Sequence, residues 1–235
     1  MTVSGYFNIG RRAFIAGVTA TGAMAVAGCM GVKTVVFSAV IRRLMVKSSD
    51  RAIETMLAPG GYWDQVVANS DVASFMGPAQ PLAKQMLVAP GTKERMDEAF
   101  GNIARSAAKV VAPVIGDVVA HVGIKNAREI AEGGPTAAAD YLRANTDGAL
   151  ARAMNSEILR AIRESDTPVM QQLKERMQNV DMTQVGMAAA RRLEGLIWDQ
   201  VGIEEAAIRA DPSSTNDPEL IEVLEKIRQQ RGNNG

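Results

Sequence analysis

The chain has 235 residues, with 26 basic and 26 acidic side chains, a single cysteine and a single histidine. One cysteine excludes an intramolecular disulfide. One histidine and no free thiol, if the cysteine carries a lipid as argued below, exclude most metal cages and Cys–His catalysis. The charge balance argues against nucleic acid as a partner, because phosphate binding needs a basic face. We therefore expect no metal, no cofactor and no nucleic acid, although a site made only of carboxylates stays possible.

The composition also indicates the fold class. Hydrophobic residues make up 47% of the chain and aromatic residues only 4%, and there are 13 methionines. A core of aliphatic side chains and methionine favours closely packed helices. We expect an all-α protein: a single helical-bundle domain of about seven to nine helices behind an N-terminal export signal.

The chain begins with a segment that predicts export. Arg11-Arg12-Ala13-Phe14-Ile15 resembles the twin-arginine motif, in which a receptor reads the arginine pair. Arg11, Arg12 and Phe14 are thus the expected signal-recognition residues. The run that follows is rich in Ala, Gly and Thr, and this weak hydrophobicity suits a twin-arginine signal better than a membrane span.

The only cysteine closes this segment. Val26-Ala27-Gly28-Cys29 resembles a lipobox, where a bacterial peptidase cuts and leaves the cysteine as a lipidated first residue. Residues 1–28 are then a signal peptide, and Cys29 carries the lipid. Two alternatives stay open: an uncleaved helix over residues 13–32, which is charge-free and about twenty residues long, or ordinary cleavage at a small-x-small site that releases a soluble protein.

Beyond Cys29 the sequence divides into three parts. Residues 29–48 form an apolar, lipidated and helical segment, residues 49–228 an all-α domain, and residues 229–235 a disordered tail. The first helix is expected over residues 34–57 with a break at Ser48-Ser49, and a strand over residues 35–37 is the alternative.

Turn residues and apolar spacing predict the later helices. Thr92 and Thr146 are expected to cap two of them, and His121 is expected to be a satisfied, partly buried side chain rather than a catalyst. The predicted helices cover residues 63–68, 82–88, 92–111, 113–122, 124–132, 135–145, 146–164, 167–179, 183–200 and 217–228.

Two stretches carry a resemblance to a known family. The first is 126–134 (NAREIAEGG), continued by 137–142 (AAADYL) and Thr146; the second is 193–197 (LEGLI) with 204–212 (EEAAIRADP). They resemble domain of unknown function 4197, a family of exported helical bacterial proteins, many with lipoprotein leaders. The likeness covers residues 49–227, and it implies an exported helical protein without an assigned activity.

The second stretch also predicts a polar contact. Glu205 and Arg209 stand four residues apart in the order that favours an ion pair on a helix. Glu204 points about 100° away, and together with Tyr141 and Arg143 these charges could line a polar cleft. Paired carboxylates can do acid–base work or hold a hard cation. We prefer a structural role, in which the charges cap helices and join two helices at the rim of the bundle.

These observations predict a non-catalytic cell-envelope lipoprotein. The lipid on Cys29 would hold a structural or interaction module at the periplasm-facing leaflet of a membrane, with an envelope protein of unknown identity as partner. Met30 after the cysteine favours the outer membrane over the inner one. The alternatives are a periplasmic binding protein for a lipid or other apolar ligand, and a hydrolase that uses Glu204 and Glu205.

Overall fold

A computed structural model describes residues 28–58, 65 and 72–232, and within these ranges the chain forms helices and no strand. The all-α class is confirmed. The two longest helices are α1 (Gly28–Leu57) and α10 (Met182–Ala210). The other elements are η1 (Val72–Ala79), α3 (Gln80–Leu87), α4 (Thr92–Ala108), α5 (Val111–Ala120), α6 (Ile124–Glu132), α7 (Ala137–Asn145), α8 (Ala149–Glu164), α9 (Pro168–Arg176), η2 (Pro212–Thr215) and α11 (Pro218–Gly232).

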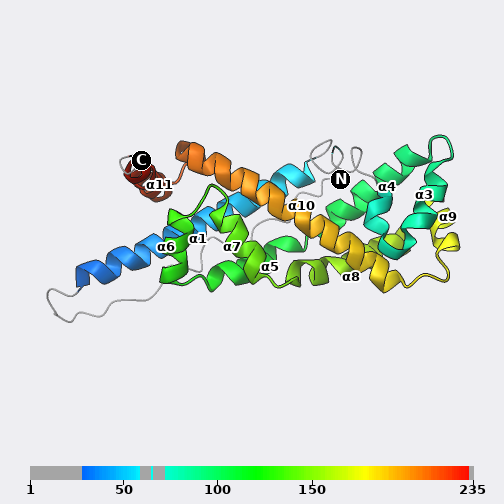
Figure 1. The fold of residues 1–235 in the computed structure, drawn as a ribbon, viewed down its shortest axis with the longest axis horizontal. Coiled ribbons are helices and arrows are strands. Elements are labelled where there is room, and N and C mark those ends of the chain that lie inside the picture. The colour runs from blue at the N-terminus through cyan, green and yellow to red at the C-terminus, as the bar shows by residue number, and fades with distance from the viewer. Residues whose placement is uncertain (1–27, 59–64, 66–71, 233–235) are drawn as a thin grey trace, which may run out of the picture.

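The molecule is elongated, and α1 and α10 run along it (Figure 1). Helix α10 packs against α1, α7, α8 and η1, so it touches most of the body. Helices α3, α4 and α9 gather at one end, while α6 and α11 lie towards the other end, from which the first turns of α1 extend (Figure 1).

The core is aliphatic and rich in methionine, as the composition predicts. Helix α8 illustrates how the sequence determines this core. Its apolar residues recur at helical spacing, so they share one face, and that face is buried; they are Leu150, Met154, Ile158 and Ile162. The largest side chains that are almost fully buried are Ile41, Leu44, Met45, Met56, Met76, Met96, Leu142, Leu150, Met154, Ile158 and Ile162.

Residues 35–37 of α1 are helical, which confirms the predicted helix there and makes the strand alternative wrong. The helix differs from the prediction at Ser48-Ser49, through which it runs unbroken. The hydroxyl of Ser48 donates to the Met45 carbonyl at 3.1 Å, which satisfies the buried serine inside the helix. The apolar stripe also continues across the predicted boundary at residue 48, because Ile41 lies in the same core as Ala52. Residues on both sides of that boundary therefore belong to one body.

Several helix ends also differ from the prediction. Gly91 and Gly148, with φ of 69° and 67°, are the N-caps of α4 and α8, in place of Thr92 and Thr146. Glycine adopts this left-handed conformation without steric cost. Helix α11 continues to Gly232, so most of the predicted disordered tail is helical. The signal segment through residue 27 and, apart from residue 65, the predicted helix over residues 63–68 lie outside the described residues.

A small second core joins α11 to the body. Val40 and Leu44 of α1 pack against Leu220 and Leu224 of α11 and Ile208 of α10. Within the described ranges, no single helix combines the length and apolar character of a membrane span. One bent pair of segments, Thr92–Ala120 with Lys125–Glu132, reaches those thresholds by length and composition.

Candidate functional site

The candidate site lies where α7 meets α10, and its centre is a buried carboxylate. Glu205 has no solvent-exposed surface. Its Oε1 accepts from the Ala138 amide at 2.9 Å and its Oε2 from the Ala139 amide at 2.8 Å. These amides belong to the first turn of α7, whose N-cap residue Thr136 makes no side-chain cap. Glu205 therefore supplies from α10 the cap that this positive helix end needs.

Arg209 extends the same network by one turn of α10. Its Nε donates to Glu205 Oε1 at 2.8 Å, and its Nη2 lies 2.7 Å from the same oxygen. Nη2 also donates to the Ile130 carbonyl, at the end of α6, at 2.9 Å. The pair thereby fixes α6 and α7 to α10 on both sides of the turn that joins them. Gly133 permits this turn, because a Cβ there would lie 2.5 Å from the Ala137 Cβ.

Burial and hydrogen bonding act on Glu205 in opposite directions. Burial raises the pKa of its carboxyl above the ordinary value, while the Arg209 charge and the two amide donors work against that rise. Every oxygen of this carboxylate already accepts hydrogen bonds from the protein. It is a structural anchor, and it is not presented to a substrate.

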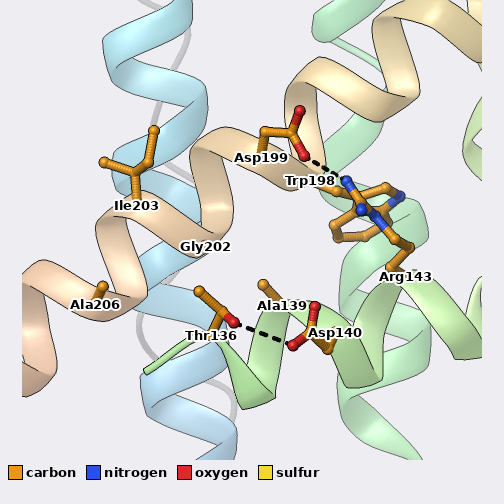
Figure 2. Close-up of a pocket in the computed structure, with 9 residues that line it drawn as sticks. All are labelled: Thr136, Ala139, Asp140, Arg143, Trp198, Asp199, Gly202, Ile203 and Ala206. Atoms are coloured by element: carbon orange, nitrogen blue, oxygen red, sulfur yellow. Dashed lines mark hydrogen bonds and ion pairs between the residues drawn. The ribbon is translucent and has the colours of Figure 1, made fainter. Parts of the chain in front are cut away.

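A groove of about 420 Å³ lies on the solvent side of this network, between α7 and α10. Figure 2 shows Asp199 and Ile203 on its α10 side, and Thr136 and Asp140 on its α7 side. The floor is made of small residues, and a Cβ on Gly202 would lie only 3.2 Å from the Thr136 Cγ2. Gly202 therefore allows the two helices to approach closely. The lining residues are Thr136, Ala139, Asp140, Arg143, Trp198, Asp199, Gly202, Ile203 and Ala206.

Arg143 crosses the groove from α7 to α10. Its Nη2 donates to Asp199 Oδ1 at 2.7 Å and to the Gly195 carbonyl at 3.2 Å, and both side chains of the ion pair are about half exposed (Figure 2). Beyond it lies a second hollow of about 210 Å³ beside Gly195. The buried Trp198 indole lines both hollows. The second hollow is lined by Arg143, Gly148, Arg191, Glu194, Gly195 and Trp198.

The residues of the predicted polar cleft do not lie together in one cleft. Arg143 lines the groove, whereas Glu205 and Arg209 lie buried behind it. Glu204 Oε1 accepts from Gln200 at 3.0 Å and from Thr55 of α1 at 3.4 Å. The Tyr141 hydroxyl accepts from Asn126 of α6 at 2.7 Å. The two adjacent glutamates thus face different elements and share no cleft.

The predicted ion pair between Glu205 and Arg209 is confirmed, but it is buried rather than exposed at a rim. Sequence reasoning missed Asp140, Asp199 and Ile203 in the groove. An apolar residue at the exposed position Ile203, one turn after Asp199, is the signal that could have indicated this surface.

His121 and Cys29 are the other candidate residues in the described part of the chain. His121 is exposed rather than partly buried, and its ring nitrogen Nδ1 lies 2.6 Å from the Asp117 carbonyl oxygen. Among the described residues, no cluster of three or more His, Cys, Asp or Glu side chains has the arrangement of a metal site. Cys29 is the second residue of α1, whereas Arg11, Arg12 and Phe14 precede the described part of the chain.

Comparison with known proteins gives one match. No curated protein and no solved structure matches the chain. A family model described as "Protein of unknown function (DUF4197)" matches residues 32–225. The match begins inside α1, before the residue 49 at which the resemblance was expected to start, which agrees with the packing of α1 into the body. Since the match covers most of its length, the chain belongs to the DUF4197 family of proteins of unknown function.

Proposed function

We propose that this protein is an exported cell-envelope lipoprotein, in which a lipid on Cys29 holds a non-catalytic interaction or structural module at the periplasm-facing leaflet of a membrane. The arginine pair at Arg11-Arg12 and the lipobox before Cys29 support export and lipidation. Met30 favours the outer membrane.

The observation that carries this proposal is the course of α1. The helix includes Cys29 and continues without a break to Val40, which has no exposed surface and packs in the second core. Eleven residues of helix, at about 1.5 Å each, correspond to about 17 Å. A lipid on Cys29 would therefore hold the body close to the headgroups, on a stiff helical stem rather than a flexible tether. The first turns of α1 extend from one end of the body, as such a stem requires (Figure 1).

The surroundings of the two glutamates support a non-catalytic role. A hydrolase that used Glu204 and Glu205 would need both carboxylates beside one substrate. Glu205 is instead occupied by two amides and an arginine, and Glu204 faces Gln200 and Thr55. We therefore do not retain the hydrolase.

A binding protein for an apolar ligand is the second candidate, and the groove favours it. Its volume of about 420 Å³ is that of a small-molecule site. In contrast, the interior hollow between Phe75, Phe100 and Leu193 has a volume of about 10 Å³, room for about one water molecule. Native mass spectrometry of the detergent-extracted chain distinguishes the two candidates, because bound lipid adds mass that organic solvent removes, whereas a lipid on Cys29 stays attached.

Metabolic labelling with a radioactive fatty acid tests the lipid anchor. We expect label on the wild-type chain and none on Cys29→Ala, because the thiol carries the diacylglycerol. A matched control, Cys29→Ala with Ala39→Cys, places a thiol at an exposed position of the same helix without a lipobox, and it should stay unlabelled. Undiminished label on Cys29→Ala would overturn the proposal. Recovery of the wild-type chain from the cytosol with its leader intact would do the same.

A further inference from the structure

Gly195 is a glycine that the packing of its own chain does not explain. Glycine is among the least favourable residues inside a helix, and a close neighbour is one reason for its presence there. The other glycines of α10 have one: a Cβ on Gly186 would lie 2.3 Å from Asn155 Oδ1, and a Cβ on Gly202 would lie 3.2 Å from Thr136 Cγ2. A Cβ on Gly195 would meet nothing within 4 Å. The space beside Gly195 is therefore open to something outside this chain.

Ile203 is the opposite feature on the same helix. Its side chain is 58% exposed, and it is one of three large hydrophobic residues that are exposed in the described part of the chain. It follows Gly195 by eight residues, which is about 12 Å along a helix. Helix α10 thus presents an apolar knob and an open hollow two turns apart.

Both features belong to one ridge of α10. Residues four apart form a continuous row on a helix surface, and such rows pack into the grooves of a second helix. Here the row, which we call the α10 ridge, is exposed or half-exposed throughout. It consists of Arg191, Gly195, Asp199, Ile203 and Ala207.

The α10 ridge is complementary to itself about its midpoint. If two copies meet antiparallel on a two-fold axis at Asp199, the knob Ile203 of each copy falls opposite Gly195 of the other. A two-fold interface repeats each contact, so both hollows are filled at once. The 210 Å³ of the hollow beside Gly195 gives room for a branched aliphatic side chain.

The charges follow the same symmetry. Asp140 lines the groove beside Ile203, and Arg191 lines the hollow beside Gly195. The two-fold operation that brings Ile203 to Gly195 brings Asp140 of one copy towards Arg191 of the other. Arg191 is exposed, and it forms no ion pair with another described residue. At the axis Asp199 meets Asp199, but each of these carboxylates already holds an Arg143 guanidinium at 2.7 Å.

We propose that two copies of this chain pair through the α10 ridge, with Ile203 of each seated beside Gly195 of the other and Arg191 paired with Asp140 across the interface. This inference names a second copy as partner for the interaction role proposed above. The pairing does not depend on the lipid on Cys29, so an experiment that disproves one of the two proposals leaves the other standing.

Sedimentation of the full-length chain tests the pairing. The chain is produced with its own leader, extracted in a mild detergent and measured at matched solvent density, so that the mass reports protein alone. We expect a dimer for the wild type, a dimer for Cys29→Ala, and a dissociation constant at least tenfold higher for Ile203→Glu. The control Val88→Glu changes another exposed hydrophobic residue, which is 83% exposed in the turn between α3 and α4, and should remain dimeric.

A larger side chain at Gly195 tests whether pairing can be lost while the fold stays stable. Gly195→Leu has room for its Cβ in the single chain, so its melting temperature should not fall, while the leucine occupies the place of the incoming Ile203. We expect this variant to sediment as a monomer. A dimer that survives both Gly195→Leu and Ile203→Glu would overturn the proposal, as would a wild-type chain that is monomeric at all concentrations tested.

A charge exchange identifies the partner as a second copy. Asp140→Arg and Arg191→Asp should each weaken the dimer at least tenfold, because each places like charges across the interface. The two changes combined restore opposite charges and should recover most of the lost affinity. A combined variant weaker than either single one would overturn the assignment of this contact. A different protein held by the ridge in place of a second copy would overturn the proposed pairing itself.

Discussion

The two sides of α10 carry ion pairs of the same length in opposite surroundings. Arg209 and Glu205 lie 2.7 Å apart with 9% and 0% of their side chains exposed, and Arg143 and Asp199 lie 2.7 Å apart with 48% and 62% exposed. The distance between the two charges therefore does not determine how much each ion pair contributes to the free energy of unfolding. Removing one partner of a buried pair leaves an uncompensated charge in the interior, whereas water replaces the lost partner of an exposed pair.

The largest expected loss of stability comes from breaking the buried ion pair of Arg209 and Glu205. Glu205→Ala removes the cap of α7 and leaves Arg209 buried without a counter-charge, so we expect unfolding free energy to fall by about 3–5 kcal/mol. Urea denaturation followed by circular dichroism measures this. Glu204→Ala is the matched control on the adjacent residue, and it should cost far less. A loss below about 1 kcal/mol for Glu205→Ala would mean that the buried network does not hold α7 in place.

Arg209→Met breaks the same network from the other partner. The methionine keeps much of the apolar volume, and Glu205 retains both amide donors of α7. We therefore expect a smaller loss, of about 1.5–3 kcal/mol, the usual contribution of hydrogen bonds to a charged group. The same urea titration measures it. If Arg209→Met proved as costly as Glu205→Ala, the arginine rather than the helix cap would dominate the network.

These residues also show how far the sequence predicts the site. The spacing of Glu205 and Arg209 predicts their ion pair, because neighbours four apart on a helix depend only on local geometry. Their burial is not local, since it depends on where the first turn of α7 crosses α10, sixty-six residues away for the Ala139 amide. The same limit applies to Ser48 and Ser49: they lie buried inside an unbroken α1 where the serines predicted a break, and their burial depends on the helices packed around α1.

The all-α fold was predictable because its pattern repeats along each helix. Leu150, Met154 and Ile158 mark the buried face of α8 without knowledge of its neighbours. The groove was not predictable, because Asp140 and Asp199 come from different helices and become neighbours only after α7 docks beside Gly202. Pairing across helices is a property of the fold, so residue spacing alone does not reveal it.

On the exposed α10 ridge, Gly195→Ala should stabilise the single chain. The added methyl group meets no atom within 4 Å, and alanine favours a helix interior over glycine by about 1 kcal/mol. This change in stability is measured by thermal unfolding. Both chains compared also carry Ile203→Glu, so that pairing through the α10 ridge does not contribute. Gly202→Ala is the control, because its Cβ would press on Thr136 and should not give this gain. A destabilised Gly195→Ala would show that the open space is needed by the chain itself.

The smallest expected effect is that of the exposed ion pair. In the same Ile203→Glu background, Asp199→Ala should change unfolding free energy by about 0–1 kcal/mol, because both charges remain hydrated and Arg143 can still donate to the Gly195 carbonyl. Raising the salt concentration should erase what little difference there is, since mobile ions screen exposed pairs. The same salt series on Glu205→Ala should leave its large loss almost unchanged, because ions do not reach the interior. If Asp199→Ala instead cost as much as Glu205→Ala, burial would not be what separates the two sides of α10.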